Sequence, residues 1–248
     1  IADGVLDACD AADGVKDGMV QNVKGCKFDP VVLTCTPGRN AACLSDAKVK
    51  VIDRIFKGTR NSKGEQIYAP WPYDPGLAAQ GWRAWKLGTP NVSPPNARNM
   101  TLIPGSIAYA FMSPPEKPSD LAQWVTQFDF DRDPPKVMKS AGGFEAGIEF
   151  ETAFSPDVDK FKARGGKIIF THGVADPIFS ALDTVDYVEQ LGKRYADVPN
   201  FARLFLIPGM THCAGGPATD SFDALTALDA WVEKGVAPDM ILAKARKT

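Results

Sequence analysis

The chain has 248 residues, of which 44% are hydrophobic and 10% aromatic, enough to bury a sizeable core in one large domain or two small ones. Its 28 basic and 30 acidic residues give a formal charge of -2, which produces no field that would attract nucleic acid or an anionic membrane. No apolar run approaches the roughly 20 residues that cross a bilayer, so we expect neither a nucleic-acid partner nor a membrane span.

Four of the five cysteines lie near the start of the chain, at Cys9, Cys26, Cys35 and Cys43. Successive pairs flank loops rich in Gly, Pro, Asp and Asn, whereas metal ligation would call for a closely spaced pair or a nearby histidine. We therefore predict the disulfides Cys9–Cys26 and Cys35–Cys43, and with them an oxidising compartment. The remaining Cys213 has no partner in this sequence, which indicates a partner elsewhere.

The stretch DACDAADGVKDGMV carries Asp10, Asp13 and Asp17 at spacings of three and four, with glycines between them. A tight turn could direct these hard anionic oxygens inward, as Ca²⁺ requires, although the register is not that of an EF-hand. A polar turn with helix-capping aspartates explains the same spacing, so the residues alone leave both interpretations open.

Residues 1–150 are predicted to be rich in loops, because stretches such as WPYDPG and GTPNVSPPNARN separate only a few helical patterns. One helix is predicted to start at an N-cap on Ser45 and to stop at Gly58, and another to begin at Ser119. Their apolar stripes are typical of core packing and not of a cofactor site.

From about Phe161 onward the pattern alternates between strand and helix. KIIFTHG (167–173) and ARLFLIPG (202–209) read as buried strands, and each is followed by a helical segment. In the second of these segments, SFDALTALDAWVEKG, the predicted inward face is Phe222, Leu225, Leu228 and Val232. This order predicts an α/β fold with a parallel sheet, whose remaining strands we expect outside this sequence, because two strands would keep exposed edges.

The two loops that follow these strands hold an acid and a histidine, Asp176 and His212. In parallel α/β proteins function gathers at the carboxyl ends of strands, and the order acid then histidine is that of α/β hydrolases. In such a triad the imidazole takes a serine proton and the carboxylate fixes its tautomer. A helix-capping aspartate and an ordinary loop histidine are the alternative, and a zinc site at His172 and His212 lacks a third ligand.

HGVADPIFSALDTVDYVEQL and ARLFLIPGMTHCAGGPATDSFDALTALDAWVEKGVAPD resemble the C-terminal segments of the tannase and feruloyl esterase family. The resemblance extends from CDAADGVKDGMV to KGVAPD, nearly the whole chain. It implies an α/β-hydrolase fold with a lid domain, here residues 1–150, ahead of part of the catalytic domain, residues 151–248. It also implies that Asp176 and His212 are the triad's acid and base.

The sequence departs from this family in one respect, because it contains neither a G-x-S-x-G elbow nor a Cys-Ser-x-Gly-Gly motif. The resemblance therefore implies that the nucleophilic serine lies upstream of Ile1. It further implies that Cys213 bonds to a cysteine directly before that serine, so the missing N-terminal part of the same protein is the expected partner. The fragment alone is expected to be inactive, and the whole protein to be secreted or periplasmic.

The resemblance also implies a structural Ca²⁺ in the lid. Its ligands would be the side chains of Asp10, Asp13 and Asp17 and the carbonyls of Val15 and Met19.

For a small aromatic ester substrate, the residues at the expected positions are Trp85, Arg98 and Phe179. In the terephthaloyl-ester branch of the family such residues stack on the ring, grip a distal carboxylate and close over it. A core tryptophan, a solvated arginine and a packing phenylalanine are the plain alternatives, and feruloyl or galloyl esters remain competing substrates. The competing function is a non-catalytic, calcium-stabilised module that binds aromatic ligands.

Overall fold

The computed structural model describes residues 1–38 and 43–246, which form two compact units. The first unit contains residues 1–57, 70–82 and 156–248, and the second contains residues 58–69 and 83–155. The N-terminal segment thus packs with the C-terminal part of the chain. The assignment of residues 1–150 to a lid stays a prediction.

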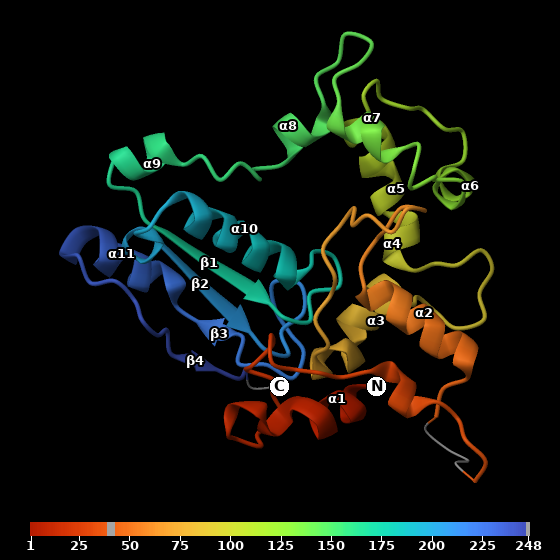
Figure 1. The fold of residues 1–248 in the computed structure, drawn as a ribbon, viewed down its shortest axis with the longest axis horizontal. Helices are drawn as coiled ribbons and strands as arrows, with labels where there is room; N and C mark the ends of the chain where they lie inside the picture. The colour runs from red at the N-terminus through yellow and green to blue at the C-terminus, as the bar shows by residue number, and fades with distance from the viewer. Residues whose placement is uncertain (39–42, 247–248) are drawn as a thin grey trace. The chain divides into compact units, whose positions relative to one another are not determined.

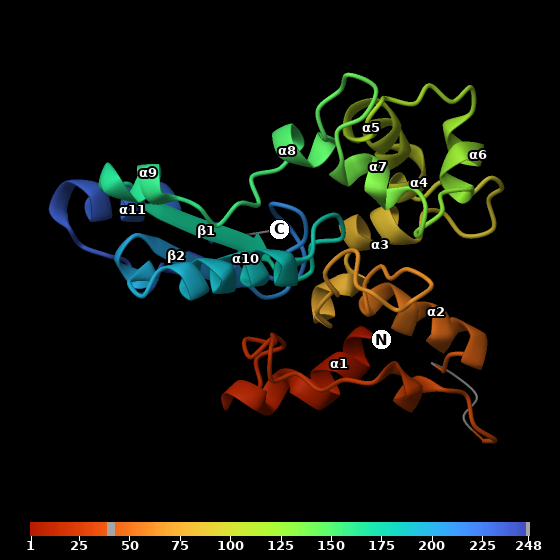
Figure 2. The same ribbon diagram turned by 45° about the horizontal axis from the view of Figure 1, so that its top comes forward.

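A parallel pair of strands lies at the centre of the first unit's C-terminal part. Strand β1 (Ile168–Gly173) pairs with β2 (Ala202–Ile207) in the register Ile168↔Ala202 to Gly173↔Ile207. Helix α10 (Ala181–Arg194) connects them, and α11 (Ala224–Lys234) follows. Figure 2 shows α10 and α11 on opposite sides of the strands. The predicted order of strand and helix is therefore confirmed.

The inward face of α11 differs from the predicted one. Leu225 is 77% exposed and Val232 54% exposed, whereas Trp231 is 3% exposed. The indole ring of Trp231 lies under the cations of Lys167 and Arg203, at 5.5 and 5.2 Å from its centroid. The buried face of α11 is therefore shifted by one residue from the predicted face, because an indole can pack beneath long basic side chains.

The strands of this unit pack on α10 through a small apolar core. It consists of Leu191, Tyr195, Val198, Phe201 and Ala202, with Ile168 and Phe170 of β1 packed against it. Short elements complete this part of the chain: α9 (Asp159–Ala163), η5 (Val198–Asn200), and the antiparallel pair β3 (Ser221–Phe222) and β4 (Ala243–Lys244).

The N-terminal segment of the first unit has a separate core around Val5, Val20, Phe28, Phe56 and Trp82. Its elements are α1 (Ala2–Cys9) and α2 (Asp46–Phe56), both labelled in Figure 1, and the short turns η1 (Asp10–Asp13), η2 (Pro30–Leu33) and η3 (Pro75–Ala78). Ser45 caps α2 as predicted, accepting from the Lys48 amide at 3.4 Å.

The second unit is built from short helices joined by loops. They are α4 (Arg98–Thr101), α5 (Ile103–Ser106), the π-helical turn η4 (Ile107–Phe111), α6 (Leu121–Thr126), α7 (Pro134–Met138) and α8 (Gly147–Glu151). Helix α6 begins at Leu121, two residues after the predicted start at Ser119, and is capped by Asp120, whose carboxylate accepts from the Gln123 amide at 3.0 Å. Helix α3 (Gln80–Lys86) crosses the boundary between the units.

Over the described ranges, every helix is too short or too polar to pass through a bilayer.

Candidate active site

Asp176 and His212 meet at one end of the parallel strand pair. The register pairs Gly173 with Ile207, so both strands end at the same edge and the two following loops lie side by side. The Nδ1 atom of His212 is 2.8 Å from Oδ2 of Asp176. The structure therefore brings together the acid and the histidine that the sequence singled out, as a hydrogen-bonded pair.

Both carboxylate oxygens of Asp176 have hydrogen-bond partners. The residue is 4% exposed, and its Oδ1 accepts from the backbone amides of Ile178 at 2.7 Å and Phe179 at 3.0 Å. With Oδ2 also accepting, His212 carries its proton on Nδ1. In the described part of the chain no hydrogen bond occupies the Nε2 atom of His212, whose side chain is 38% exposed, so its lone pair is available as a base.

Close approach of the two loops depends on Gly173 at the end of β1. A Cβ atom at this position would lie 2.4 Å from the carbonyl oxygen of Met210 and 2.7 Å from that of Thr211. Real Cβ atoms do not approach that closely, so any larger residue would push the His212 loop away from Asp176.

A cleft of about 290 Å³ opens beside the pair, and His172, Phe179, Met210, Cys213 and Phe222 are among the residues that line it. The Phe179 ring is 56% exposed and its centroid lies 5.8 Å from that of His212. A flat apolar group could therefore pack on Phe179 next to the imidazole.

His172 has a part in this site that the sequence did not reveal, since there it was considered only as a zinc ligand. Its Nε2 lies 3.1 Å from the carbonyl oxygen of Phe179 and 3.7 Å from Oδ2 of Asp176, and its Nδ1 lies 2.7 Å from the Thr184 hydroxyl. A carbonyl oxygen only accepts, so Nε2 donates to Phe179 and Nδ1 accepts from Thr184. His172 thus ties the Phe179 segment to α10. The signal that could have identified it is its position on β1, four residues before Asp176.

Trp85 and Arg98, the other predicted substrate residues, belong to the second unit. The Arg98 guanidinium carbon lies 5.8 Å from the centroid of the Trp85 ring, the arrangement of a cation–π pair. Trp85 sits on α3 and Arg98 is the first residue of α4. The two residues are therefore neighbours in space, and their substrate role stays a prediction.

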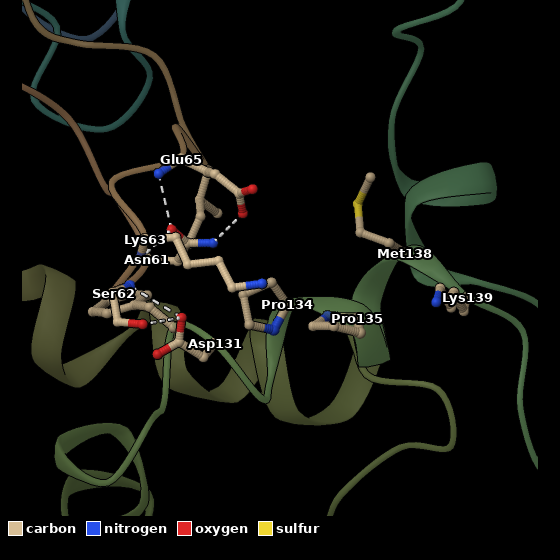
Figure 3. A pocket seen from close by; sticks show the side chains of 11 residues that line it. Asn61, Ser62, Lys63, Glu65, Asp131, Pro134, Pro135, Met138 and Lys139 are labelled. Atoms are coloured by element: carbon tan, nitrogen blue, oxygen red, sulfur yellow. Dashed lines mark hydrogen bonds between the residues drawn. The ribbon is translucent and has the colours of Figure 1, made fainter.

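The second unit also contains an open groove of about 600 Å³ (Figure 3). The polar side chains on one side of it bond to one another: Asn61 donates to Glu65 at 2.6 Å, and the Ser62 hydroxyl donates to Asp131 at 3.1 Å. Met138 faces them across the opening. None of the described lining residues is a histidine, so Ser62 has no imidazole beside it and its hydroxyl donates to a carboxylate instead. The cleft at His212 is accordingly the stronger candidate for catalysis.

The acidic loop forms tight turns in which the carboxylates accept backbone hydrogen bonds. Asp10 accepts from the amides of Asp17 at 3.2 Å and Gly18 at 3.0 Å, and Asp13 accepts from that of Val15 at 2.9 Å. Asp17 accepts from the amide of Met19 at 3.1 Å. Across residues 1–38 and 43–246, no three His, Cys, Asp or Glu side chains converge on a common metal position. The donors are the hard oxygens that Ca²⁺ prefers, but the carboxylates are engaged with amides, so the calcium site stays a prediction.

The predicted disulfides are confirmed. Cys9 is bonded to Cys26 and Cys35 to Cys43. Cys213 is a free, exposed cysteine within the described residues and follows His212 directly, with a φ of 63°.

The whole chain, residues 1–248, matches the family model described as tannase and feruloyl esterase. The chain belongs to the tannase and feruloyl esterase family. Among curated members, it is 42% identical to the mono(2-hydroxyethyl) terephthalate hydrolase of Piscinibacter sakaiensis over 98% of this chain and 44% of that protein. It is 28% identical to a probable feruloyl esterase of Arthroderma benhamiae over 96% of this chain and 43% of that protein. The chain thus spans less than half the length of these relatives.

Solved structures of the tannase and feruloyl esterase family share the fold. Feruloyl esterase B from Aspergillus oryzae superposes with a TM-score of 0.70 at 23% identity, covering 96% of this chain and 47% of that one. Tannin acyl hydrolase from Aspergillus niger superposes with a TM-score of 0.68 at 21% identity, covering 96% and 45%. At this level of identity the likeness shows the α/β architecture alone.

Proposed function

We propose that this chain supplies the acid, Asp176, and the base, His212, of a serine esterase that hydrolyses esters of aromatic acids. The observation that carries the proposal is the 2.8 Å contact between the two side chains on adjacent loops. The related proteins support it, since those named above are a hydrolase of a terephthalate ester and a probable feruloyl esterase. The nucleophilic serine would come from a segment outside residues 1–248.

The chemistry follows from the protonation of the pair. Nε2 of His212 removes the proton of the serine hydroxyl as its oxygen attacks the ester carbonyl, and Asp176 stabilises the resulting imidazolium. The imidazolium then protonates the departing alcohol, which leaves an acyl-enzyme. In the second half of the reaction water is the nucleophile. His212 removes a proton from the water as its oxygen adds to the acyl carbon, and the imidazolium then returns that proton to the serine oxygen as the aromatic acid is released.

The acyl group would be a feruloyl, galloyl or terephthaloyl type. Phe179, exposed beside His212, offers a flat apolar surface for an aromatic ring. Arg98 beside Trp85 suits an aromatic acid with a second carboxylate, because a guanidinium pairs bidentately with that group.

Three further elements belong to the proposal. A Ca²⁺ ion would bind at Asp10, Asp13 and Asp17 with the carbonyls of Val15 and Met19, and would act structurally. Cys213 would bond to a cysteine before the nucleophile, linking the two catalytic loops. The two disulfides agree with a secreted or periplasmic location.

The decisive experiment compares His212→Ala and Asp176→Asn in the full-length protein. Removal of the base should lower kcat by about four orders of magnitude, as expected for a triad member, with little change in KM. Asp223→Asn is a matched control, because Asp223 is an exposed carboxylate that caps α11 through the Thr226 amide. A His212→Ala variant that retains turnover would exclude this site, and a full-length chain without a nucleophilic serine would favour a binding module.

Acyl specificity is tested with aromatic esters that do or do not carry a free para carboxylate. Arg98→Ala should raise KM for the carboxylated esters by about tenfold and leave the others nearly unchanged. Arg83→Ala, which removes a guanidinium from α3, controls for loss of positive charge. Equal losses across the panel would contradict the anchoring role of Arg98.

A further inference from the structure

A segment of the first unit, residues 70–76, lies against both loops that carry the candidate pair. We call it the brace. The Trp71 indole Nε1 donates to the carbonyl oxygen of Asp176 at 3.1 Å, and the Ser180 hydroxyl donates to the carbonyl of Pro70. The Asp74 carboxylate accepts from the amide of Gly209, three residues before His212, at 3.0 Å. The brace thus bonds to the acid's loop and to the histidine's loop.

Asp74 makes the longest-range of these bonds from a fully buried position. The residue is 1% exposed, its Oδ1 accepts from the Gly76 amide at 2.7 Å, and its Oδ2 accepts from Gly209. The bond to Gly76 is a local turn that many Asp-Pro sequences form. The bond to Gly209 spans 135 residues and contributes nothing to that turn, so its effect is on the position of the His212 loop.

The brace also packs closely against both loops. A Cβ atom on Gly76 would lie 2.4 Å from the carbonyl oxygen of Gly209 and 2.5 Å from Cβ of Ala175, the residue before Asp176. Gly76 is therefore in contact with both loops at once, and the backbone of the brace packs against them beside the point where the Ala175 amide donates to the Met210 carbonyl at 3.0 Å.

From this geometry we propose that the brace, through Asp74 and Trp71, positions Asp176 and His212 for the esterase reaction. The proposal rests on the proposed function of the pair. Neither brace residue touches the reacting atoms, so both act through the loops they hold. Displacing a catalytic group by about 1 Å can cost orders of magnitude in rate, which makes this contact consequential.

Ionisation of Asp74 should make the effect of the brace on kcat depend on pH. Burial raises the pKa of Asp74 to about 6, against the opposing effect of the Gly76 and Gly209 amides. The titratable groups around it are Asp3 and Asp7 of α1, both exposed, Tyr73 of the brace itself, and Asp176, His212 and Asp220 of the two loops. Within the described residues none of these groups has a hydrogen bond or ion pair with Asp74.

The experiment measures kcat and KM of the full-length protein between pH 5 and pH 8 for wild type and Asp74→Asn. Asparagine has one acceptor oxygen where the carboxylate uses two, so one of the two amides loses its partner. At pH 8 we expect kcat to fall by about tenfold with KM within about twofold. Below pH 6 the deficit should shrink to within about threefold, because wild type is then protonated and resembles the amide.

Asp29→Asn is the matched control, because Asp29 is an exposed residue that precedes Pro30 and caps η2 by accepting from the Val31 amide at 2.9 Å. It should leave the pH profile unchanged. Trp71→Phe, which removes the donor to Asp176 and keeps an aromatic ring, tests the brace if Asp74→Asn fails to fold, and should also lower kcat with little change in KM. A kcat equal to wild type in a folded brace variant would overturn the proposal.

His212→Ala is assayed in parallel to separate the two hypotheses. If His212→Ala abolishes turnover while both brace variants behave as wild type, only the positioning role fails. If His212→Ala stays active, the proposed function fails whatever the brace variants do.

Discussion

At the scale of single residues, Asp74 has a predictable effect on stability as well as on rate. Its pKa is raised from 3.8 to about 6 because the carboxylate is desolvated in the folded protein. Between these values the folded protein keeps a proton that the unfolded chain has released, so the free energy of unfolding falls as pH rises through the window. A difference of about 2 pH units corresponds to about 3 kcal/mol.

Comparison with Asp74→Asn isolates this effect, since the amide does not titrate. Between pH 7 and pH 4, wild type should gain stability relative to the variant by up to about 3 kcal/mol. Urea unfolding at several pH values measures the difference in the free energy of unfolding between the two proteins. The effects of the other carboxylates are the same in both proteins and cancel. A gap that stays constant over this range would show that Asp74 titrates normally.

The candidate pair could be predicted from the sequence, whereas the residues that hold it could not. Asp176 and His212 each follow a strongly apolar strand, and parallel strands end at one edge, so their order along the chain already places them together. Trp71 and Asp74 contact that site across 105 and 135 residues from within a loop-rich stretch. No periodicity in WPYDPG reports such distant partners, because the contacts depend on how the loops fold back.

At the scale of elements, the N-caps of α10 and α2 offer a direct comparison. Ser180 is buried, accepts from the Leu182 amide at 3.2 Å and donates to the carbonyl of Pro70, whereas Ser45 is exposed and has the single capping bond to Lys48. Ser180→Ala should therefore cost about 2 kcal/mol and Ser45→Ala about 0.5 kcal/mol. Thermal unfolding of the two variants measures this, and equal losses would mean that the contact with Pro70 contributes nothing.

The two disulfides should likewise differ in their effect. Cys9–Cys26 closes a separation of 17 residues and Cys35–Cys43 one of 8, and Cys9 is 1% exposed. If only the entropy of loop closure counts, replacing each disulfide by a pair of alanines lowers the free energy of unfolding by about 3 kcal/mol for Cys9–Cys26 and about 2.5 kcal/mol for Cys35–Cys43. Loss of packing around Cys9, which lies in the core with Val5 and Phe28, adds about 1 kcal/mol to the first. Thermal denaturation of the full-length variants should thus show the larger loss for the Cys9–Cys26 pair, and the reverse order would contradict this account.

The helices show why a hydrophobic pattern predicts that a helix exists better than it predicts which face of the helix is buried. Helix α2 begins directly after Ser45, the serine that the pattern indicates, because caps act locally. The predicted buried face of α11 was wrong by one residue. The buried residue is Trp231, which packs beneath Lys167 and Arg203 and does not lie in the aliphatic stripe. That choice depends on basic residues far along the chain, which a helical period does not register.

At the scale of the whole molecule, the strand pair indicates how residues 1–248 should behave when expressed alone. Beside β1 an almost entirely apolar pocket of about 200 Å³ is lined by Phe161, Phe170, Tyr187, Leu191 and Phe201. Parallel sheets in α/β proteins normally bury both faces and extend beyond two strands, so such a surface is typical of a contact with further structure. The expected consequences are binding of a hydrophobic dye and reduced solubility.

Under the proposed function the isolated chain should also lack turnover, since its His212 would have no serine hydroxyl to deprotonate. Purified residues 1–248, oxidised so that both disulfides form, should hydrolyse aromatic esters no faster than buffer, while the full-length protein hydrolyses them. Near-ultraviolet circular dichroism serves as the control for folding, since Trp71 and Trp82 lie in packed surroundings. Turnover by the folded chain that disappears in His212→Ala would place the nucleophile within these 248 residues and contradict the proposed division of the triad.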